Sequence, residues 1–468
     1  MHGDPDFDWA FESEVEPGLA LFPESDEQDG PQAAVEDGRE GTAVTTAAAA
    51  NGDGYGAEAR DGRRMKQPRG RVLGGSRAIN SFALIYPGAE EYDFWATELG
   101  NEGWGWEGTE HYFRRFQTIV RPEEHVVEKL RLESNFNGGA GDGPVQATFP
   151  KTILPVHSVW LEAFRDLGLE SSRDPLTGRA LGGAITSNHI DAVSRERCHA
   201  AVAYLTPEVR ARANPMVVAG AFVKRVEFGE KADQSDLAVA RSVLYEKDGR
   251  SREIKVGREV ILAAGAFGSP QLLELSGIGN GQLLSKHAID VVYDNPAVGE
   301  NLQDHIRAGI SHEPAEAADS QPRISNEEAE KLYDENRTGP WAEMAAYMFA
   351  YMPLVPFSSK AEMQELATIC QQQRQRDDDG GKLSPFERKQ RDFVTDTLFS
   401  PGQSQRDRLP HPSSPCALHP TRTRERPAHH LLRHALPPSV ARKRAHHLSR
   451  PQSQAGRDIQ LLHPSSRP

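Results

Sequence analysis

The stretch RVLGGSRAINS, residues 71–81, carries the clearest local signal in the chain. Two adjacent glycines follow a short apolar run, a serine comes next, and an asparagine lies four residues after the serine. A glycine turn between a strand and a helix N-terminus can form an anion site, because backbone N–H groups point outward and no Cβ atom blocks close approach. A single turn of this kind is more often structural than functional, so its meaning depends on the flanking sequence.

A second glycine turn, AAGAFGSP, occupies residues 263–270. Residues 258–279, REVILAAGAFGSPQLLELSGIG, therefore predict a buried strand, the glycine turn and then a helix. Ser269 is a natural N-cap for that helix, and Pro270 is a natural first helical residue. Upstream, residues 214–228, NPMVVAGAFVKRVEF, predict two strands joined by a turn.

Between the two glycine turns, residues 156–167, VHSVWLEAFRDL, predict a helix with one apolar face. Val156, Trp160 and Phe164 recur at intervals of four residues, and Gly168 suits the C-terminal cap. Three neighbouring apolar residues extend the predicted face: Val159, Ala163 and Leu167.

The composition bounds the fold and the possible partners. The chain has 468 residues, which gives room for two or three domains. Its apolar fraction of 37% and mean hydropathy of −0.60 are low for a globular protein of this length, so part of the chain is expected to lie outside any packed core. From about residue 63 to 355 the mixture of helical and strand patterns is typical of an α/β protein. The net charge of −14 argues against a nucleic-acid partner for the whole molecule.

Two segments lack apolar periodicity. Residues 23–60 are acidic, small and glycine-rich, and they predict a disordered insert because they cannot bury enough surface to offset their ordering entropy. Residues 401–468 contain 12 Lys or Arg against 3 Asp or Glu, with 11 of the 32 prolines and 8 of the 17 histidines, and they predict a disordered tail. A basic tail can bind nucleic acid, but this one has neither interleaved aromatic residues nor a recognition motif.

Other sequence features set simple limits. The three cysteines, Cys198, Cys370 and Cys416, lie far apart and predict reduced thiols rather than a disulfide framework or a metal site. No run of 18 apolar residues is present, so no membrane association is expected. The acidic N-terminus lacks the layout of a signal peptide, and a cytoplasmic location is the default expectation.

Several motifs occur together in a fixed order. Residues 70–95, GRVLGGSRAINSFALIYPGAEEYDFW, followed by GNEGWGW at 100–106, closely resemble the first signature of the glucose–methanol–choline (GMC) oxidoreductases. GAFGSPQLLELSGIG at 265–279 is similar to their second signature, and AVGENLQDH at 297–305 is similar to a further hallmark of the family. By these three motifs the chain is identified as a member of the family.

The resemblance implies an α/β fold in which a Rossmann-like domain binds FAD and a second, α+β domain on an antiparallel sheet covers the flavin. Such enzymes oxidise the CH–OH group of a small alcohol or sugar by moving a hydride to the flavin. The expected boundaries are 1–22 and 61–150 for a partial FAD-binding region, 23–60 for the disordered insert, 151–310 for FAD-binding segments interleaved with substrate-domain elements, 311–400 for the rest of the substrate domain, and 401–468 for the disordered tail.

The resemblance also assigns residues to the cofactor. Eight residues are implied to contact FAD: Gly74, Gly75, Ser76, Asn80, Ser81, Phe82, Ala83 and Val223. The glycines and the first serine would lie at the diphosphate or the flavin ring, the next four residues would follow the isoalloxazine, and Val223 would meet the adenine through its backbone. Asp304 and His305 belong to a motif close to the flavin, but neither is assigned a catalytic role.

Two positions depart from the family pattern. The family repeats the serine of the first turn, whereas this chain has Arg77 in the second place. A guanidinium there could pair with a phosphate or could crowd the turn. Tyr86, Pro87 and Gly88 stand where the family has an aromatic residue, an arginine and a glycine, which removes a donor and a charge.

Both ends of the family pattern are missing from the sequence. The strand–GxGxxG–helix that seats the FAD diphosphate is not found, and GGAGDG at 138–143 is expected to be a loop because no strand and helix flank it. The family's histidine base lies in an HPxGT stretch, of which His411 and His463 copy only two letters, so no catalytic residue is assigned. We therefore expect a truncated or mispredicted member that is, as written, inactive.

Two interpretations of function follow from the sequence. The first is a FAD-dependent oxidoreductase acting on an alcohol or sugar, and the alternative is a catalytically inactive remnant of such an enzyme. The sequence leaves open the donor, the choice between oxidase and dehydrogenase, the oligomeric state, and whether FAD binds without the first βα unit.

Overall fold

The computed structural model describes residues 6–12, 66–82, 84–86, 88–136, 138–169, 175–179, 181–229, 238–303, 324–343, 347–355, 358–379 and 383–399. These residues belong to two compact units. The first unit contains residues 6–12, 66–71, 218–229 and 238–303, and the second unit contains the other described residues. The predicted insert and tail lie outside the described residues, as do Ala83, Asp304 and His305.

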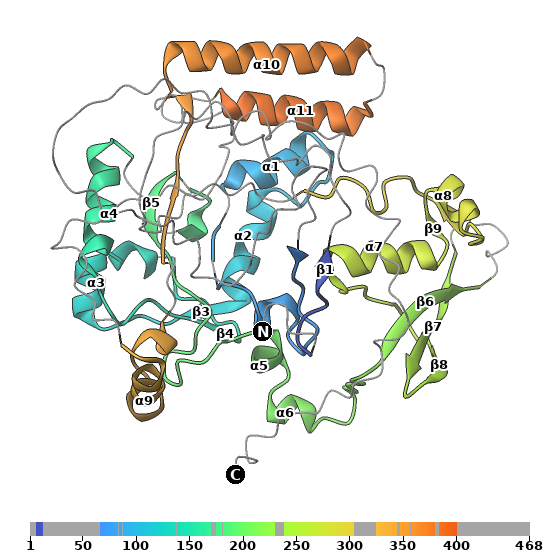
Figure 1. The fold of residues 1–468 in the computed structure, drawn as a ribbon, viewed down its shortest axis with the longest axis horizontal. Coiled ribbons are helices and arrows are strands. Elements are labelled where there is room, and N and C mark those ends of the chain that lie inside the picture. The colour runs from blue at the N-terminus through green and yellow to red at the C-terminus, as the bar shows by residue number, and fades with distance from the viewer. Residues whose placement is uncertain are drawn as a thin grey trace, which may run out of the picture. The chain divides into compact units, whose positions relative to one another are not determined.

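A three-stranded antiparallel sheet is the main element of the first unit (Figure 1). Strand β6 (Phe222–Phe228) pairs with β7 (Ala240–Lys247), which pairs in turn with β8 (Arg250–Lys255). Asp248 and Gly249 form the turn between β7 and β8, and their φ angles are +55° and +68°. A two-residue turn with two positive φ angles matches the twist of a hairpin, so this Asp-Gly pair sets the register of the two strands.

Helix α7 (Gly265–Leu275) packs against β6 of this sheet (Figure 1). Ser276, directly after the helix, ties the two together because its Oγ accepts the N–H of Val226 at 2.8 Å. The rest of the first unit comprises β1 (Phe11–Glu12) paired antiparallel with β2 (Lys66–Gln67), and β9 (Ile278–Gly279), α8 (Gly281–Lys286) and β10 (Tyr293–Asp294), with β9 parallel to β10.

Helix α7 begins earlier than the sequence predicts. Its first residue is Gly265, so Pro270 lies inside the helix rather than at its start. The N-cap residue is Ala264, so the predicted cap at Ser269 was wrong; Ser269 lies inside the helix, where its Oγ accepts the N–H of Ala264 at 3.0 Å. The prediction of a helix was therefore right, and the predicted first residue was wrong.

Two strands predicted around this helix are not formed. Residues 258–264 adopt no strand, and the side chain of Ile261 is 79% exposed. Residues 214–218 are also unpaired, with Met216 86% exposed, so only β6 forms in that stretch. An apolar strand persists only when neighbouring strands satisfy its N–H and C=O groups, and no described residue pairs with either segment as a strand.

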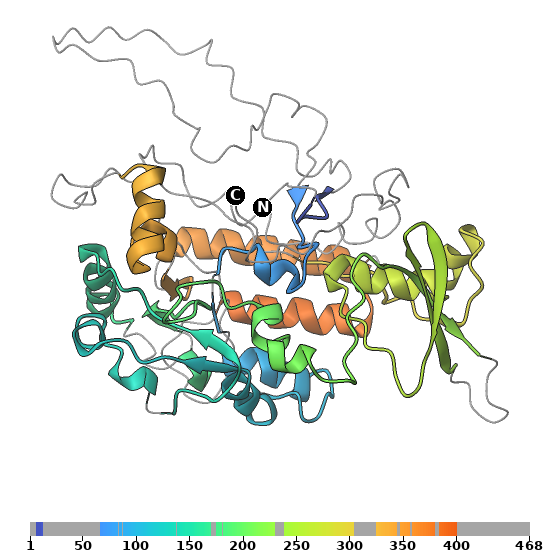
Figure 2. The same cartoon turned by 90° about the horizontal axis from the view of Figure 1, so that it is seen from below.

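Helices dominate the second unit (Figures 1 and 2). They are α1 (Ala89–Thr97), α2 (Trp106–Arg115), α3 (Glu124–Leu130), α4 (Pro155–Asp166), α5 (Ala200–Tyr204), α6 (Pro207–Arg210), α9 (Asn326–Asn336), α10 (Lys360–Asp379) and α11 (Pro385–Leu398). Two short sheets accompany them, the parallel pair β3 (Gln117–Ile119) with β4 (Val145–Ala147) and the antiparallel pair β5 (Gly182–Ile185) with β11 (Met348–Tyr351). This mixture agrees with the predicted α/β class, while the assignment of a Rossmann-like domain and a substrate domain stays a prediction.

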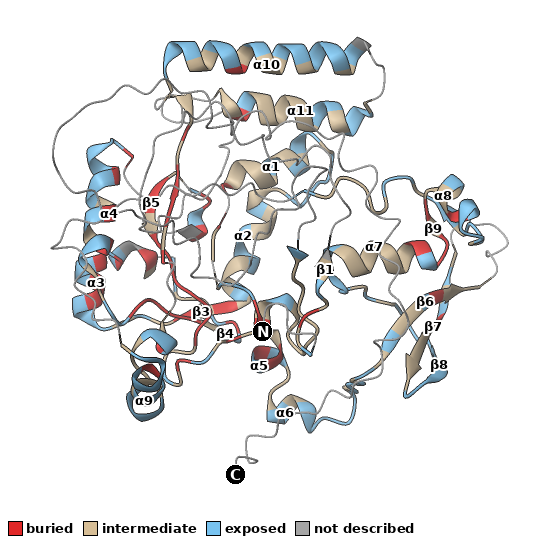
Figure 3. Ribbon diagram, in the orientation of Figure 1, coloured by how far each residue is buried: buried red, intermediate tan, exposed pale blue. Residues whose placement is uncertain are grey.

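The core of the second unit lies where α3 and α4 meet β5 and β11. Its largest fully buried members include Phe149, Leu130, Leu132 and Leu176. Figure 3 shows buried positions concentrated on the short strands and on the inner sides of α3 and α4, whereas α10 is mostly exposed. The second unit therefore has one main apolar cluster and an outer helical layer.

Helix α4 confirms the predicted helix and its C-terminal cap. Gly168 has a φ of +73° and donates to Arg165 O, while Leu169 N–H bonds to Phe164 O, which is the Schellman arrangement. The predicted apolar face is only partly right. Trp160 and Phe164 are buried, but the third buried residue is His157.

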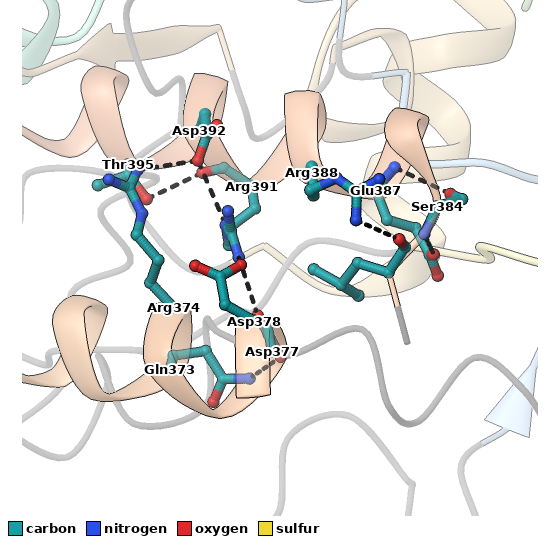
Figure 4. Close-up of polar contacts among 11 residues, drawn as sticks. Gln373, Arg374, Asp377, Asp378, Ser384, Glu387, Arg388, Arg391, Asp392 and Thr395 are labelled. Carbon is teal, nitrogen blue, oxygen red and sulfur yellow. Dashed lines mark hydrogen bonds and ion pairs between the residues drawn. The ribbon is translucent and has the colours of Figure 1, made fainter. Parts of the chain in front are cut away.

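The long helices α10 and α11 lie side by side in both views (Figures 1 and 2). Arg391 on α11 joins them, because its guanidinium lies 3.7 Å from a carboxylate oxygen of Asp377 and 3.3 Å from one of Asp378, both on α10 (Figure 4). A second bridge runs from Arg374 on α10 to Asp392 on α11 at 2.8 Å. Charge pairs thus link the two helices (Figure 4).

A largely covered carboxylate, that of Glu343, joins three loops of the second unit. Glu343 Oε1 accepts the N–H groups of Lys151 and Thr152 at 2.9 and 3.0 Å, and its Oε2 accepts the hydroxyl of Tyr347 at 3.2 Å. Oε2 also lies 3.5 Å from Nη2 of Arg195, whose side chain is fully buried. Glu343 is therefore the counter-charge of an arginine that has no access to water.

Candidate functional site

The glycine turn predicted from the sequence is formed in the second unit. Gly74 and Gly75 have φ angles of +101° and +61°, which L side chains rarely adopt. A Cβ atom at Gly74 would lie 2.4 Å from His199 Nδ1, whereas one at Gly75 would meet nothing within 4 Å. Glycine at position 74 is therefore required for packing against His199, and the backbone at position 75 borders open space.

The turn leads into a 3-10 helix of four residues. The carbonyl of Ser76 accepts the N–H groups of Ile79 and Asn80 at 3.1 and 2.9 Å, which ends the helix. Ala78 and Ile79 are buried, while Ser76, Asn80 and Ser81 are exposed. The apolar side chains thus anchor the segment, and the polar ones predicted to meet the cofactor lie on its outer side.

Arg197 holds the end of this segment. Its Nη1 donates to Arg77 O at 3.0 Å and to Asn80 Oδ1 at 2.9 Å, and its Cζ lies 3.4 Å from the centroid of the Phe82 ring. Asn80 Oδ1 also accepts the N–H of Phe82 at 3.2 Å. One guanidinium therefore fixes a carbonyl, an amide and an aromatic ring within six residues of chain.

Phe82 adopts a strained backbone conformation. Its φ of +62° lies in the left-handed region, which costs a bulky residue about 1–2 kcal/mol. With its amide oriented so that both groups pair, Asn188 Nδ2 donates to Phe82 O at 3.0 Å. The N–H, the C=O and the ring of Phe82 are therefore all held, and this is what maintains the strained conformation.

Arg77, the residue that departs from the family pattern, turns into the second unit. Its Nη2 contacts His189 Nδ1, and His189 Nε2 lies 3.1 Å from Gln117 Oε1. Gln117 Nε2 in turn donates to the hydroxyl of Tyr86 at 2.5 Å. Because arginine can only donate, His189 Nδ1 is the acceptor and Nε2 carries the proton. The guanidinium is thus engaged with His189, not presented to a phosphate.

Burial sets the protonation states of the residues behind the turn. It lowers the pKa of His199, and the positive charges of Arg197 and Arg77 lower it further, so the imidazole is neutral at pH 7. Its Nδ1 accepts the N–H of Ala201 at 3.2 Å, which caps α5. Burial raises the pKa of the Cys198 thiol, which therefore stays protonated at neutral pH.

The predicted contacts are divided between the units. Six of the eight, the residues from Gly74 to Phe82, form one continuous segment in the second unit. Ala83 lies outside the described residues. Val223 belongs to the first unit, where it lies in β6 opposite Tyr245, next to an irregularity in the pairing.

Four residues that contact the segment and support its conformation were not predicted from the sequence. They are Asn188, His189, Arg197 and His199. The available signal was RERCHA at 195–200, where two arginines and a histidine stand directly before an apolar helix. Charged side chains just before an apolar helix need hydrogen-bond partners when the helix packs against the core. The carbonyl and amide groups of a neighbouring polar loop can be those partners.

Two further observations bear on the kind of site. Within the described ranges, no helix is long and apolar enough to cross a membrane, and no group of three or more His, Cys, Asp or Glu side chains could hold a metal ion. Cys198 is a buried free thiol and Cys370 a half-buried one.

Comparison with known proteins places these features in a family. A family model described as GMC oxidoreductase matches residues 35–307, starting within the predicted insert, whose boundaries stay a prediction. The GMC oxidoreductase family protein Mala s 12 of Malassezia sympodialis is 32% identical over 264 residues, which are 56% of this chain and 42% of that protein. The chain therefore spans less than half the length of this curated relative.

Two solved structures share the fold. A FAD-dependent oxidoreductase from Chaetomium thermophilum is 25% identical with a TM-score of 0.61, and the match covers 73% of this chain and 59% of that one. A fungal aryl-alcohol oxidase is 25% identical with a TM-score of 0.56, and that match covers 66% of this chain and 53% of the oxidase. The family model itself covers more than half of the present chain. The chain belongs to the GMC oxidoreductase family.

Proposed function

We propose that this chain acts as a FAD-dependent oxidoreductase that oxidises the CH–OH group of an alcohol or sugar. Family membership supports the class of reaction. FAD, the cofactor predicted from the sequence, is also the cofactor of the Chaetomium relative, and the fungal relative is an oxidase of aryl alcohols. The observation that carries the proposal is the segment from Gly74 to Phe82, in which the backbone at Gly75 borders open space and the polar side chains of Ser76, Asn80 and Ser81 are exposed.

The segment fits the chemistry of FAD. The diphosphate and the carbonyl groups of the flavin are hydrogen-bond acceptors, and they need donors on a surface that a planar ring can approach. Gly75 leaves room at its backbone, Ser76 and Ser81 expose hydroxyl groups, and Asn80 exposes an amide. These residues, with Gly74 and Phe82, would hold the cofactor, and bound FAD supplies the hydride acceptor.

A second candidate function is that of a non-catalytic family member. The exposed apolar run at 258–264 supports it, because this segment has the composition of a sheet strand and yet no strand among the described residues pairs with it. A protein of this kind would bind FAD weakly or would bind it without turnover.

Spectroscopy of the purified chain separates the two candidates. The chain is incubated with FAD, passed through a desalting column and examined for flavin absorbance. Aromatic alcohols, aliphatic alcohols, choline and sugars are then added in turn without oxygen. We expect retained flavin bands that bleach with one class of donor. Loss of all flavin on the column would overturn the proposal, and retained flavin that no donor bleaches would favour the non-catalytic member.

A further inference from the structure

Asn80 is the one side chain of the candidate segment whose amide orientation can be deduced from its partners. Its two hydrogen-bond partners are Arg197 Nη1 and the backbone N–H of Phe82. Both are donors, and neither can accept a hydrogen bond. The atom that faces them must therefore be the carbonyl oxygen, so the choice between Oδ1 and Nδ2 is decided by chemistry.

The remaining part of this amide is a pair of N–H donors. Within the described part of the chain, Asn80 Nδ2 has no hydrogen-bond partner, and the residue is exposed. The neighbouring groups are already engaged, because the N–H, the C=O and the ring of Phe82 are bonded to Asn80, Asn188 and Arg197. Nδ2 is thus the free polar group that this arrangement presents.

We infer that Arg197 is a positioning residue that presents Asn80 to a ligand as a hydrogen-bond donor. The guanidinium occupies Asn80 Oδ1 and stacks on Phe82, so the amide cannot turn its oxygen outward without losing a charge-assisted bond. The ligand group that Asn80 takes is consequently an acceptor, such as a carbonyl oxygen or a phosphate oxygen. This inference rests on the proposed function in one respect only, the identity of that ligand as FAD.

Arg197 suits this role better than lysine would. Its planar guanidinium can lie on an aromatic face and still donate from its edge, whereas an ammonium group is a point charge without a face. Arg197 and Phe82 are both half-buried, which strengthens the stacked contact because it lowers the local dielectric constant. Removing the guanidinium would release Asn80 and Phe82 together.

Three variants test the inference. Arg197→Met keeps the length of the side chain but removes the donors, and Arg212→Met is the matched control at an exposed arginine of the same unit. Asn80→Asp keeps an acceptor for Arg197 and for the Phe82 N–H but replaces the N–H donors by an oxygen. The variants thus separate the ordering of the segment from the presentation of a donor.

Hydrogen exchange of the chain without FAD measures how strongly Arg197 orders the segment around Phe82. In Arg197→Met, we expect the amide of Phe82 to exchange about tenfold faster, as loss of one charge-assisted hydrogen bond implies. Asn80→Asp and Arg212→Met should exchange at the original rate. Unchanged exchange in Arg197→Met overturns the positioning role, and this result does not depend on whether the chain binds FAD.

Titration with FAD and with ADP measures whether Asn80 Nδ2 donates a hydrogen bond to the ligand. Asn80→Asp should raise the Kd for FAD by about tenfold or more, because a donor becomes a repelling acceptor, while Arg212→Met should leave it unchanged. A parallel loss for ADP places the acceptor on the diphosphate, and an unchanged affinity for ADP places it on the flavin. An unaltered Kd for both ligands in Asn80→Asp overturns the donor role. If the original chain binds no FAD, the proposed function fails, and the exchange experiment still decides the role of Arg197.

Discussion

Gly74 is the residue of the candidate segment that tolerates least change. Alanine at this position would adopt a φ of +101° and place a Cβ atom 2.4 Å from His199 Nδ1. We expect Gly74→Ala to lower the free energy of unfolding of the second unit by about 2–4 kcal/mol, from left-handed strain and overpacking together. Gly75→Ala, which meets open space, should cost only about 1–2 kcal/mol. Urea unfolding followed by fluorescence measures both, and equal losses would contradict the contact with His199.

Glu343 is a residue whose charge matters more than its shape. Glu343→Gln preserves an acceptor for Lys151 and Thr152 but leaves the buried guanidinium of Arg195 without a counter-charge. We expect a loss of about 3–5 kcal/mol in the free energy of unfolding. The control is Glu133→Gln, which removes one of the two carboxylate partners of Arg121 on the surface and should cost at most about 1 kcal/mol. A similar small loss for both variants in urea unfolding would show that the buried pair contributes little.

Helix α7 carries a carboxyl group that should make the first unit sensitive to pH. Burial, with a smaller contribution from the charge of Glu300, raises the pKa of Glu274 to about 7, whereas the unfolded chain has a value of about 4.3. Between these two values only the folded state holds the proton, so stability falls as the pH rises from about 4.3 to about 7 and then levels off. Glu274→Gln should be no more stable than the original chain near pH 4 and clearly more stable at pH 8. Unfolding curves at the two pH values test this, and an equal difference at both would rule out the carboxyl as the cause.

The α10–α11 pair depends on Arg391. Its side chain is only 14% exposed and lies between Asp377, Asp378 and Asp392 (Figure 4). Arg391→Gln would leave Asp377, equally buried, beside other carboxylates, and we expect the thermal transition of this helix pair to fall by several degrees. Arg388→Gln is the control, since Arg388 is exposed and its guanidinium donates, among the described residues, only to Leu383 O. A fall of the same size in both variants would argue against the charge network.

Sequence periodicity predicted elements better than it predicted their surroundings. The helix at 156–167 was recognisable because its apolar spacing and its terminal glycine are local properties. The presence of His157 on its buried face was not, because that depends on the N–H of Leu154, which His157 Nδ1 accepts at 3.2 Å. The strand at 258–264 failed for a related reason, since a strand requires partners that its own residues do not encode.

The candidate site shows the same limit at the scale of the whole molecule. Glycines and exposed polar residues from 74 to 82 could be predicted from a motif, since these residues are adjacent in sequence. Arg197 and His199 could not, because they reach the segment only after more than a hundred residues of intervening chain have folded. A motif thus identifies residues that are adjacent in sequence, while folding determines the distant residues that contact them.

Exposure of the segment at 258–264 should affect how molecules of this chain associate. An unpaired apolar run with Ile261 at 79% exposure has the features of a segment that pairs between copies. We expect Ile261→Lys to reduce self-association at high concentration without lowering the temperature of unfolding. Ile289→Lys, at a less exposed isoleucine of the same unit, is the comparison and should destabilise the unit. Light scattering and thermal unfolding provide the two readings, and undiminished association of Ile261→Lys would contradict this expectation.

The buried thiol of Cys198 can report how often the structure next to the candidate segment opens. Its two sequence neighbours, Arg197 and His199, contact the segment at Asn80 and Gly74. The thiol itself is buried, and burial raises its pKa so that it stays protonated. Its Sγ accepts the N–H of Gln146 at 3.2 Å and its side chain packs with Val145 and Ala203, so a thiol reagent can reach it only when these contacts open. The rate at which Cys198 is modified consequently measures how often the structure behind Arg197 and His199 opens.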